Sequence, residues 1–221
     1  EESANARDCY SGKLTLDFLE EKLSAERLPS ITELDLSSSK IRDIEPLPAH
    51  RFRSLACMNL SSNLLTAHGL RGLRGLPSLQ ELRLGSNKIS SLLPAIQVDP
   101  DAAPAAPGSA DTMDGAFSGV EVLDLSSNAM SSVEDLGVHL LPALKALRLS
   151  RNDVGRIRRM PACPLLRELH LDANRLRSID DGALVGLGAL RVLRLRENSL
   201  RTLAALTVLQ TLQLLDLASN R

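Results

Sequence analysis

The stretch Leu79-Gln-Glu-Leu-Arg-Leu-Gly-Ser-Asn-Lys-Ile89 decides the fold of this chain. Apolar residues occupy its first, fourth, sixth and eleventh positions, and an asparagine occupies the ninth. The same eleven-residue pattern begins again at Leu55, Val120, Leu144, Leu166 and Leu190. Residues 31–41 match except that Ser39 replaces the asparagine, and a last copy runs from Leu212 to Asn220. Eight copies leave little room for chance, so the chain is an array of repeats.

The spacing of the copies indicates how each one folds. The residues at the asparagine position follow one another at steps of 22 or 24, apart from one step of 41 between Asn87 and Asn128. Each copy supplies a short strand, whose alternate residues point to opposite faces. The asparagine carboxamide can satisfy backbone groups where the chain turns away from that strand. The fourth and sixth positions then form the core: Leu34/Leu36, Met58/Leu60, Leu82/Leu84, Leu123/Leu125, Leu147/Leu149, Leu169/Leu171, Leu193/Leu195 and Leu215/Leu217.

The pattern resembles the leucine-rich repeat. We therefore expect an α/β fold, a solenoid with a parallel β-sheet on its concave face. Short helices or 3₁₀ turns are expected on the convex face, where apolar spacing such as Leu70-x-x-Leu73-x-x-Leu76 recurs. One coil cannot bury its own leucines, so stability comes from stacking neighbouring coils.

Four segments follow from this periodicity. Residues 1–30 form an N-terminal helical cap, with Asp17 opening a capping box that ends at Glu20. Residues 31–93 hold repeats 1–3, and residues 94–119 form a flexible insertion rich in proline and alanine. Residues 120–221 hold repeats 4–8, of which the last is incomplete, so we expect the natural chain to continue beyond Arg221.

Composition excludes several classes of protein. The formal net charge is −1, hydrophobic residues make up 43% and charged residues 24%, as in a folded globular protein. No apolar run approaches the roughly 18 residues that span a bilayer, so no membrane partner is expected. The three cysteines, Cys9, Cys57 and Cys163, form no C-x-x-C pair. They indicate neither a zinc site nor a disulfide framework, which favours a reducing, intracellular setting.

The sequence offers little for catalysis. It contains no phosphate-binding loop, nucleophile elbow or zinc-protease motif. His170 lies between Glu168 and Asp172 on one strand face, which would allow a metal site or an acid–base pair, although a solvated histidine among carboxylates is the simpler interpretation. We therefore predict a non-enzymatic chain without catalytic residues, metal, cofactor or small-molecule substrate.

Charge is distributed unevenly along the chain. Residues 1–140 carry 12 basic and 20 acidic residues, whereas residues 141–221 carry 14 basic and 7 acidic ones. The concave face is the expected binding surface, and the chain has no tryptophan to anchor an interface, which leaves arginine. The candidate binding residues are Arg148, Arg151, His170, Asp172, Arg194 and Arg196 in the basic half, and Glu33 and Asp35 in the acidic half. Arginines that simply solvate a leucine-rich array are the plainer alternative.

Stretches outside the consensus carry a narrower resemblance. Leu16-Asp-Phe-Leu-Glu-Glu-Lys-Leu23, Leu65-Thr-Ala-His-Gly-Leu70 and Arg167-Glu-Leu-His-Leu-Asp-Ala-Asn174 resemble the ciliary members of the intracellular leucine-rich repeat family. That resemblance implies a scaffold of the ciliary or flagellar axoneme, a cytoplasmic setting, and protein partners that are axonemal or microtubule-associated. It implies no catalytic residues.

Three other functions stay open. The 22- and 24-residue periods permit a regulatory protein that binds a phosphatase, for which Glu33 and Asp35 would be contact residues. An RNA-associated adaptor is less favoured, because no stacking aromatics interleave the arginines. An extracellular ligand-binding domain would need cysteine-rich caps, which the sequence lacks.

Overall fold

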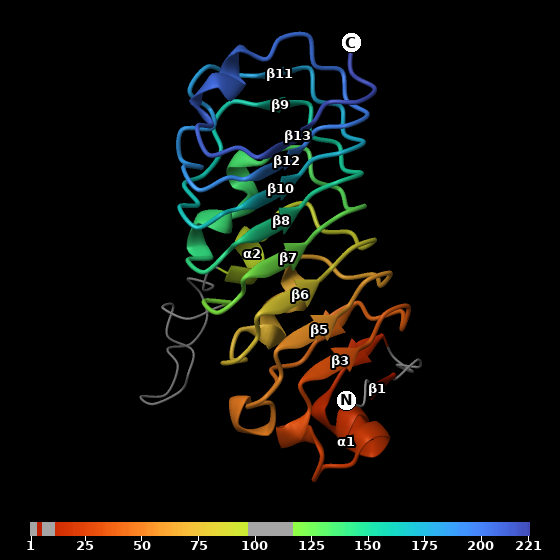
Figure 1. Ribbon diagram of the computed structural model, residues 1–221. Coiled ribbons are helices and arrows are strands. Elements are labelled where there is room, and N and C mark those ends of the chain that lie inside the picture. The colour runs from red at the N-terminus through yellow and green to blue at the C-terminus, as the bar shows by residue number, and fades with distance from the viewer. Residues whose placement is uncertain (1–3, 6–11, 97–116) are drawn as a thin grey trace.

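The computed structural model describes residues 4–5, 12–96 and 117–221. Within these ranges, parallel strands stack in chain order into one sheet along the molecule (Figure 1). The sheet has nine strands: β1 (Ala4–Asn5), β3 (Glu33–Asp35), β5 (Cys57–Asn59), β6 (Glu81–Arg83), β7 (Val122–Asp124), β8 (Ala146–Arg148), β10 (Glu168–His170), β12 (Val192–Arg194) and β13 (Leu214–Asp216). The predicted parallel sheet is confirmed.

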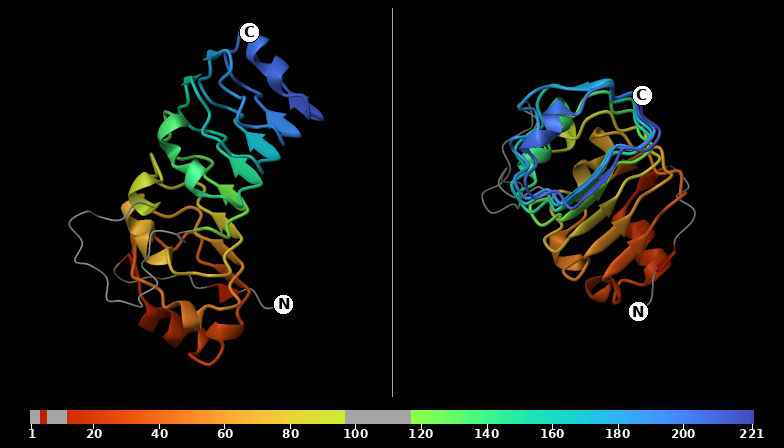
Figure 2. Two further views of the ribbon diagram at one scale, coloured as in Figure 1. Left: turned by 90° about the vertical axis from the view of Figure 1, so that its left-hand side faces the viewer. Right: turned by 45° about the horizontal axis from the view of Figure 1, so that its top comes forward.

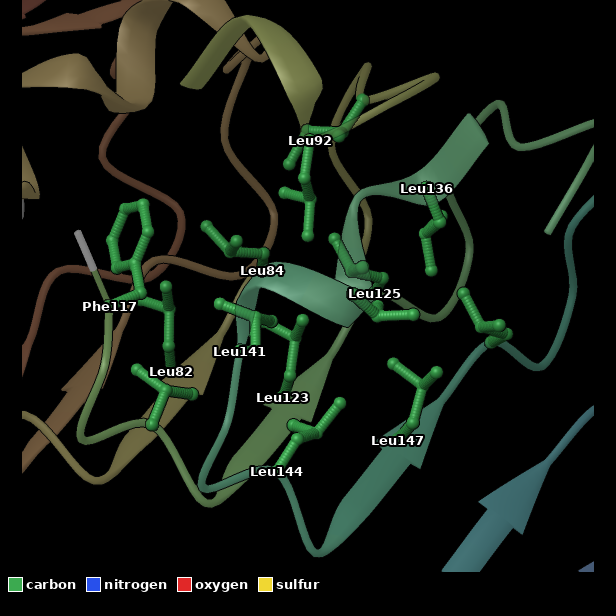
Figure 3. Close-up of a cluster of buried hydrophobic side chains, with 14 of the residues drawn as sticks. Leu82, Leu84, Leu92, Phe117, Leu123, Leu125, Leu136, Leu141, Leu144 and Leu147 are labelled. Carbon is green, nitrogen blue, oxygen red and sulfur yellow. The ribbon is translucent and has the colours of Figure 1, made fainter. Parts of the chain in front are cut away.

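The fourth residue of the sequence pattern is the central residue of each of the eight three-residue strands of this sheet. Leu82 of β6 pairs in register with Met58 of β5 and with Leu123 of β7, so these inward side chains stack directly above one another. Figure 3 shows how leucines from adjacent coils fill the interior. The predicted core pairs are buried from Leu34 to Leu195.

The last pair departs from the prediction. Leu215 in β13 is 41% exposed, and Leu217 is only partly buried. β13 pairs with β12 on one side and ends the sheet on the other. Its leucines therefore lack the covering coil that buries their counterparts in the rest of the array.

The return side carries short turns, as predicted. Figure 2 shows them opposite the sheet. They are 3₁₀ helices and one short α-helix: η1 (Leu28–Ser30), η2 (Ala49–Arg51), η3 (His68–Leu73), α2 (Leu93–Ile96), η5 (Glu134–Leu136), η6 (Val138–Leu140) and η7 (Ala204–Val208). Two small parallel sheets were not predicted. β2 (Lys13–Leu14) pairs with β4 (Asp43–Ile44), and β9 (Arg156–Ile157) pairs with β11 (Ser178–Ile179).

The N-terminal cap contains the expected helix with a different first residue. α1 spans Leu16–Leu23, and its N-cap is Thr15, whose hydroxyl accepts a hydrogen bond from the Phe18 N–H at 3.2 Å. The predicted cap, Asp17, instead lies in the first turn, where a carboxylate favours the helix dipole. Leu19 is buried, and Phe18 and Leu23 pack partly against the core, so the helix turns an apolar face toward the solenoid.

Both ends of the predicted insertion contribute side chains to the core. Residues 97–116 lie outside the described residues. Residues 94–96, however, belong to α2, where Ala95 is fully buried. Phe117 is buried against the leucines of the third and fourth repeats (Figure 3). Both ends of the predicted 94–119 segment therefore belong to the solenoid, because they contribute apolar side chains to its core.

Asparagines join each coil to the one before it. Asn63 Nδ2 donates to the Leu36 and Leu60 carbonyls at 2.9 Å, and its Oδ1 accepts from the backbone N–H groups of Ser39 and Ile41. The same arrangement recurs at Asn152, Asn174 and Asn198. The carboxamide thus satisfies buried backbone groups of two coils at once, as the sequence predicted.

Candidate functional site

The concave face presents the residues that flank the buried central position of each strand. In the basic half these include Arg148 on β8, His170 on β10 and Arg194 on β12. His170 is paired in register with Arg148 on one side and with Arg194 on the other. Because neighbouring strands lie about 4.8 Å apart, the three side chains leave the sheet as one row. We call Arg148, His170 and Arg194 the basic row.

Neither arginine of the basic row forms an ion pair within the described part of the chain. Arg194 is exposed and Arg148 is half-buried. Within the ranges that the structure describes, no carboxylate lies at ion-pair distance from either guanidinium. A guanidinium offers paired N–H donors that match a carboxylate. The basic row can therefore accept an anionic partner without breaking an internal salt bridge.

His170 is half-buried between these arginines. Burial lowers the pKa of His170 most, and the charges of Arg194 and Arg148 lower it further, while Asp172 and Glu168 act in the opposite direction. Its Nε2 lies 3.9 Å from Glu168 Oε2. Since the pKa falls below its ordinary value, His170 is neutral near pH 7 and this contact is not an ion pair. The side chain that the sequence predicted to be solvated among carboxylates is thus only partly exposed, at 20%.

Asp172 does not join His170 in a site. Its Oδ1 accepts a hydrogen bond from the Arg196 backbone N–H at 2.9 Å, which commits the carboxylate to the next coil. Arg196 is exposed and donates from Nε to Glu197 Oε1 at 3.1 Å. Among the described residues, no three histidine, cysteine, aspartate or glutamate side chains converge as metal ligands. The metal alternative at His170 therefore has no structural support.

Arg151 lies outside the basic row. It is exposed in the turn that follows β8, with a φ of 57°, and its backbone N–H donates to the Asp172 carbonyl at 2.8 Å. The residue before each repeat asparagine adopts this left-handed conformation, as Ser86 and Glu197 also do. Arg151 therefore flanks the edge of the concave face, as its place after the strand predicted.

The acidic half of the face is more self-contained. Asp35 Oδ1 accepts from the Ser37 N–H at 2.8 Å, and Oδ2 accepts from Asn59 Nδ2 at 3.2 Å. Burial raises the pKa of Asp35, but these hydrogen bonds outweigh it and hold the pKa below its ordinary value. Arg83 pairs with Glu81 at 2.7 Å, a contact that sequence reasoning missed. Glu33 is exposed.

A hollow on another side of the coils also gathers charged groups. It is lined by Ser131, Ser132, Glu134, Asp153, Gly155, Arg156 and Arg158. Arg156 forms a bidentate pair with Asp180 at 2.8 Å, and Glu134 accepts hydrogen bonds from Ser132 and from the Arg158 backbone N–H. Most of its charges are thus already satisfied within the protein, which leaves the concave face as the stronger candidate.

Comparison with known proteins decides the family. A leucine-rich repeat family model matches residues 29–89 and 164–221, more than half of the chain. The chain belongs to the leucine-rich repeat family. Leucine-rich repeat domains generally mediate interactions with proteins or other ligands, and they are typically non-enzymatic.

This chain is also similar to a solved structure. The structure is entitled a crystal structure of a TLR13–ssRNA13 complex, and this chain matches it at 26% identity with a TM-score of 0.64. The match covers 86% of this chain and 25% of that chain, so this chain spans about a quarter of the length of the other. No described helix of this array is long and apolar enough to cross a bilayer.

Proposed function

We propose that this chain is a non-enzymatic scaffold whose concave face binds an acidic segment of a protein partner along the basic row. The observation that carries the proposal is the pairing of Arg148, His170 and Arg194 on three adjacent strands. Their spacing matches the strand separation, so an extended acidic segment crossing the strands would meet one cationic or donor group at each.

Charge along the chain supports an acidic partner. Residues 141–221 hold 14 basic and 7 acidic residues. The exposed Arg151 extends the positive edge past the strand end, whereas the guanidinium of Arg196 is already paired with Glu197. Potentials of one sign over a face raise the rate of encounter with a partner of the opposite sign.

For the cellular setting we propose the ciliary or flagellar axoneme. This rests on the resemblance of the non-consensus stretches, such as Leu16 to Leu23, to leucine-rich-repeat-containing protein 9, a long ciliary protein. Cilia from the source organism would be extracted with detergent and then with high salt, and each fraction searched for peptides of this chain by mass spectrometry. Recovery in the detergent-resistant axoneme is expected. Peptides confined to cytosol or nucleus would contradict the setting.

The binding surface is tested by charge reversal. Wild-type chain, the double variant Arg148→Glu/Arg194→Glu and the control Arg177→Glu would each be cross-linked in axonemal extract. Arg177 is exposed and lies outside the basic row. We expect the double variant to lose the main cross-linked neighbours by at least about tenfold, because reversal turns attraction into repulsion, while the control keeps them. Unchanged cross-links in the double variant would refute the surface.

RNA is the second candidate ligand, because the solved neighbour is entitled a complex with ssRNA13. The same arginines could contact phosphates, and that binding would weaken steeply with salt. Titration of single-stranded RNA at two salt concentrations distinguishes the two ligands. The phosphatase alternative is supported less, since both oxygens of Asp35 already accept hydrogen bonds within the protein, from the Ser37 N–H and from Asn59 Nδ2.

A further inference from the structure

Four consecutive return segments in the C-terminal half contain no acidic residue, lysine or arginine. They are residues 137–144, 160–166, 182–190 and 202–212. The return segments of the first and second repeats differ, because they carry Arg51, Arg53, Arg71 and Arg74. Charge is therefore missing from one side of the same coils whose opposite side carries the basic row.

Large apolar side chains in these segments face outward. Leu140 is 39% exposed, Leu165 is 49% exposed and Val185 is 68% exposed, each in a different coil. None of these three side chains is buried in the core, so core packing does not account for their apolar character. Contiguous exposed apolar surface on a folded protein marks an interaction site more often than scattered single residues do.

The segments lie against one another. The buried Cys163 thiol approaches the Val138 carbonyl at 3.9 Å, which joins the first segment to the second. A Cβ on Gly186 would come within 3.1 Å of Ala162 Cα, which joins the second to the third. Thr211 Oγ1 donates to the Gly188 carbonyl at 3.1 Å, which joins the third to the fourth. The four segments thus form one surface, which we call the convex apolar band.

A line of cations borders this band where the chain enters the strands. Lys145, Arg167 and Arg191 precede β8, β10 and β12, and successive backbone bonds link them, from Arg167 N–H to Lys145 O and from Arg191 N–H to Arg167 O. Lys145 pairs with Glu121 at 2.7 Å. Arg167 and Arg191 are exposed, and no carboxylate in the described ranges pairs with them. The opposite border has mixed charge, with Arg158, Arg159 and Asp181.

We propose that the convex apolar band is a second protein-binding site, which takes an amphipathic segment with an apolar stripe and acidic residues along one edge. The stripe would cover Leu140, Leu165 and Val185, and the acidic edge would meet Arg167 and Arg191. This site goes beyond the proposed function, because it uses the opposite side of the coils and different residues.

Charge and composition select this occupant. A second copy of the chain that paired through the same band would bring two arginine borders together, which costs energy by like-charge repulsion. A membrane surface is favoured by aromatic anchors at the interface, and the four segments contain no Trp, Tyr or Phe. An acidic amphipathic segment satisfies the apolar side chains and the two unpaired arginines together.

Selection from a displayed peptide library tests the site. The library would be panned on the whole 221-residue chain. Bound peptides would be measured by fluorescence anisotropy against wild type, Val185→Asp, the double variant Arg167→Glu/Arg191→Glu and Arg194→Glu. Val185 is exposed, so its variant is expected to fold, which circular dichroism checks. Vesicles of phosphatidylserine and phosphatidylcholine serve as the membrane probe.

The proposal predicts that enriched peptides combine an apolar stripe with aspartate or glutamate. Val185→Asp should weaken them at least about tenfold, the double variant should switch the preference to lysine-bearing versions, and Arg194→Glu should leave affinity unchanged. No enrichment of acidic amphipathic peptides, or affinity insensitive to Val185→Asp, would overturn it, as would vesicle binding that Val185→Asp abolishes. Because Arg194→Glu reports on the concave face alone, failure of either site is seen separately.

Discussion

Asn174 donates from Nδ2 to the Leu149 carbonyl of the preceding coil at 2.9 Å, across 25 residues of chain. The same nitrogen donates to Leu171 in its own coil, and Oδ1 accepts from the Val154 N–H at 3.1 Å. One buried side chain therefore holds two coils in register. Stability in a stacked array depends on such contacts between neighbours.

Replacing Asn174 by alanine should destabilise the chain strongly. The change leaves backbone groups of two coils buried without partners, and each such group costs about 1–3 kcal/mol. We expect a loss of roughly 2–4 kcal/mol in the free energy of unfolding in urea. Asn220→Ala is the matched control, because Asn220 makes similar bonds in the last coil, where water can reach them. Equal losses at the two positions would contradict the role of burial.

Gly72 in η3 faces β4, and Gly75, which follows η3 and faces Leu47, is its matched control. A Cβ on Gly72 would lie 2.3 Å from the Ile44 carbonyl oxygen, whereas a Cβ on Gly75 would lie 3.7 Å from its nearest atom, the Leu47 carbonyl oxygen. Gly72→Ala should therefore force backbone apart and cost roughly 1–3 kcal/mol, the usual scale of overpacking. Gly75→Ala should be close to neutral. Thermal melts of both variants test this prediction. An unchanged melting temperature for Gly72→Ala would refute the close packing of η3 on β4.

The sequence predicted the strands, core and asparagine bonds because all three repeat. All eight copies place apolar residues at the same inward positions, and the short repeat period places each residue beside its equivalent in the next coil. Contacts that do not repeat were missed. Thr15 replaces Asp17 as the cap of α1 because the cap depends on where the chain leaves β2, which occurs only once. The glycine contacts of η3 escaped for the same reason.

The candidate site was predicted in part. Strand alternation placed Arg148, His170 and Arg194 on one face. The register that aligns them followed from their equal position, the fifth, in three copies of the pattern. The spacing of these residues did not predict which of their charges are paired within the protein. Asp172 and Arg196 are bound to neighbouring groups within the turn, which reduces their role in recognition. Which ions are paired depends on side-chain conformations, which the repeat spacing does not determine.

Cys163 should be an unreactive thiol in the native protein. Burial raises its pKa to about 11, and thiolate is the reactive form. Iodoacetamide near pH 8 should therefore modify Cys163 only when the coils open, at a rate that rises with urea. Because Cys163 lies beneath the convex apolar band, a bound acidic peptide should slow the labelling further. Peptide mapping by mass spectrometry separates Cys163 from the half-buried Cys57, and rapid native labelling of Cys163 would contradict its burial.

His170 should make both stability and partner binding depend on pH. Its pKa lies below the ordinary value of 6.5 in the folded chain, so the unfolded chain takes up the proton first as pH falls. Stability from this group is thus complete above about pH 6.5 and declines below it until the folded pKa is reached. Urea midpoints of wild type and His170→Gln between about pH 5 and 8 should diverge on the acid side. Identical profiles would exclude the effect.

Binding of an acidic segment to the basic row should change the pKa of His170 in the direction opposite to burial. Partner carboxylates would offset the charges of Arg148 and Arg194, which together with burial disfavour the imidazolium, while Glu168 and Asp172 already favour it. The pKa of His170 should therefore rise on binding, and affinity should increase several-fold as pH falls from about 7.5 to 6. Glutamine in place of His170 should keep the affinity at high pH and lose the increase. A pH-independent wild-type affinity would show that the partner does not reach His170.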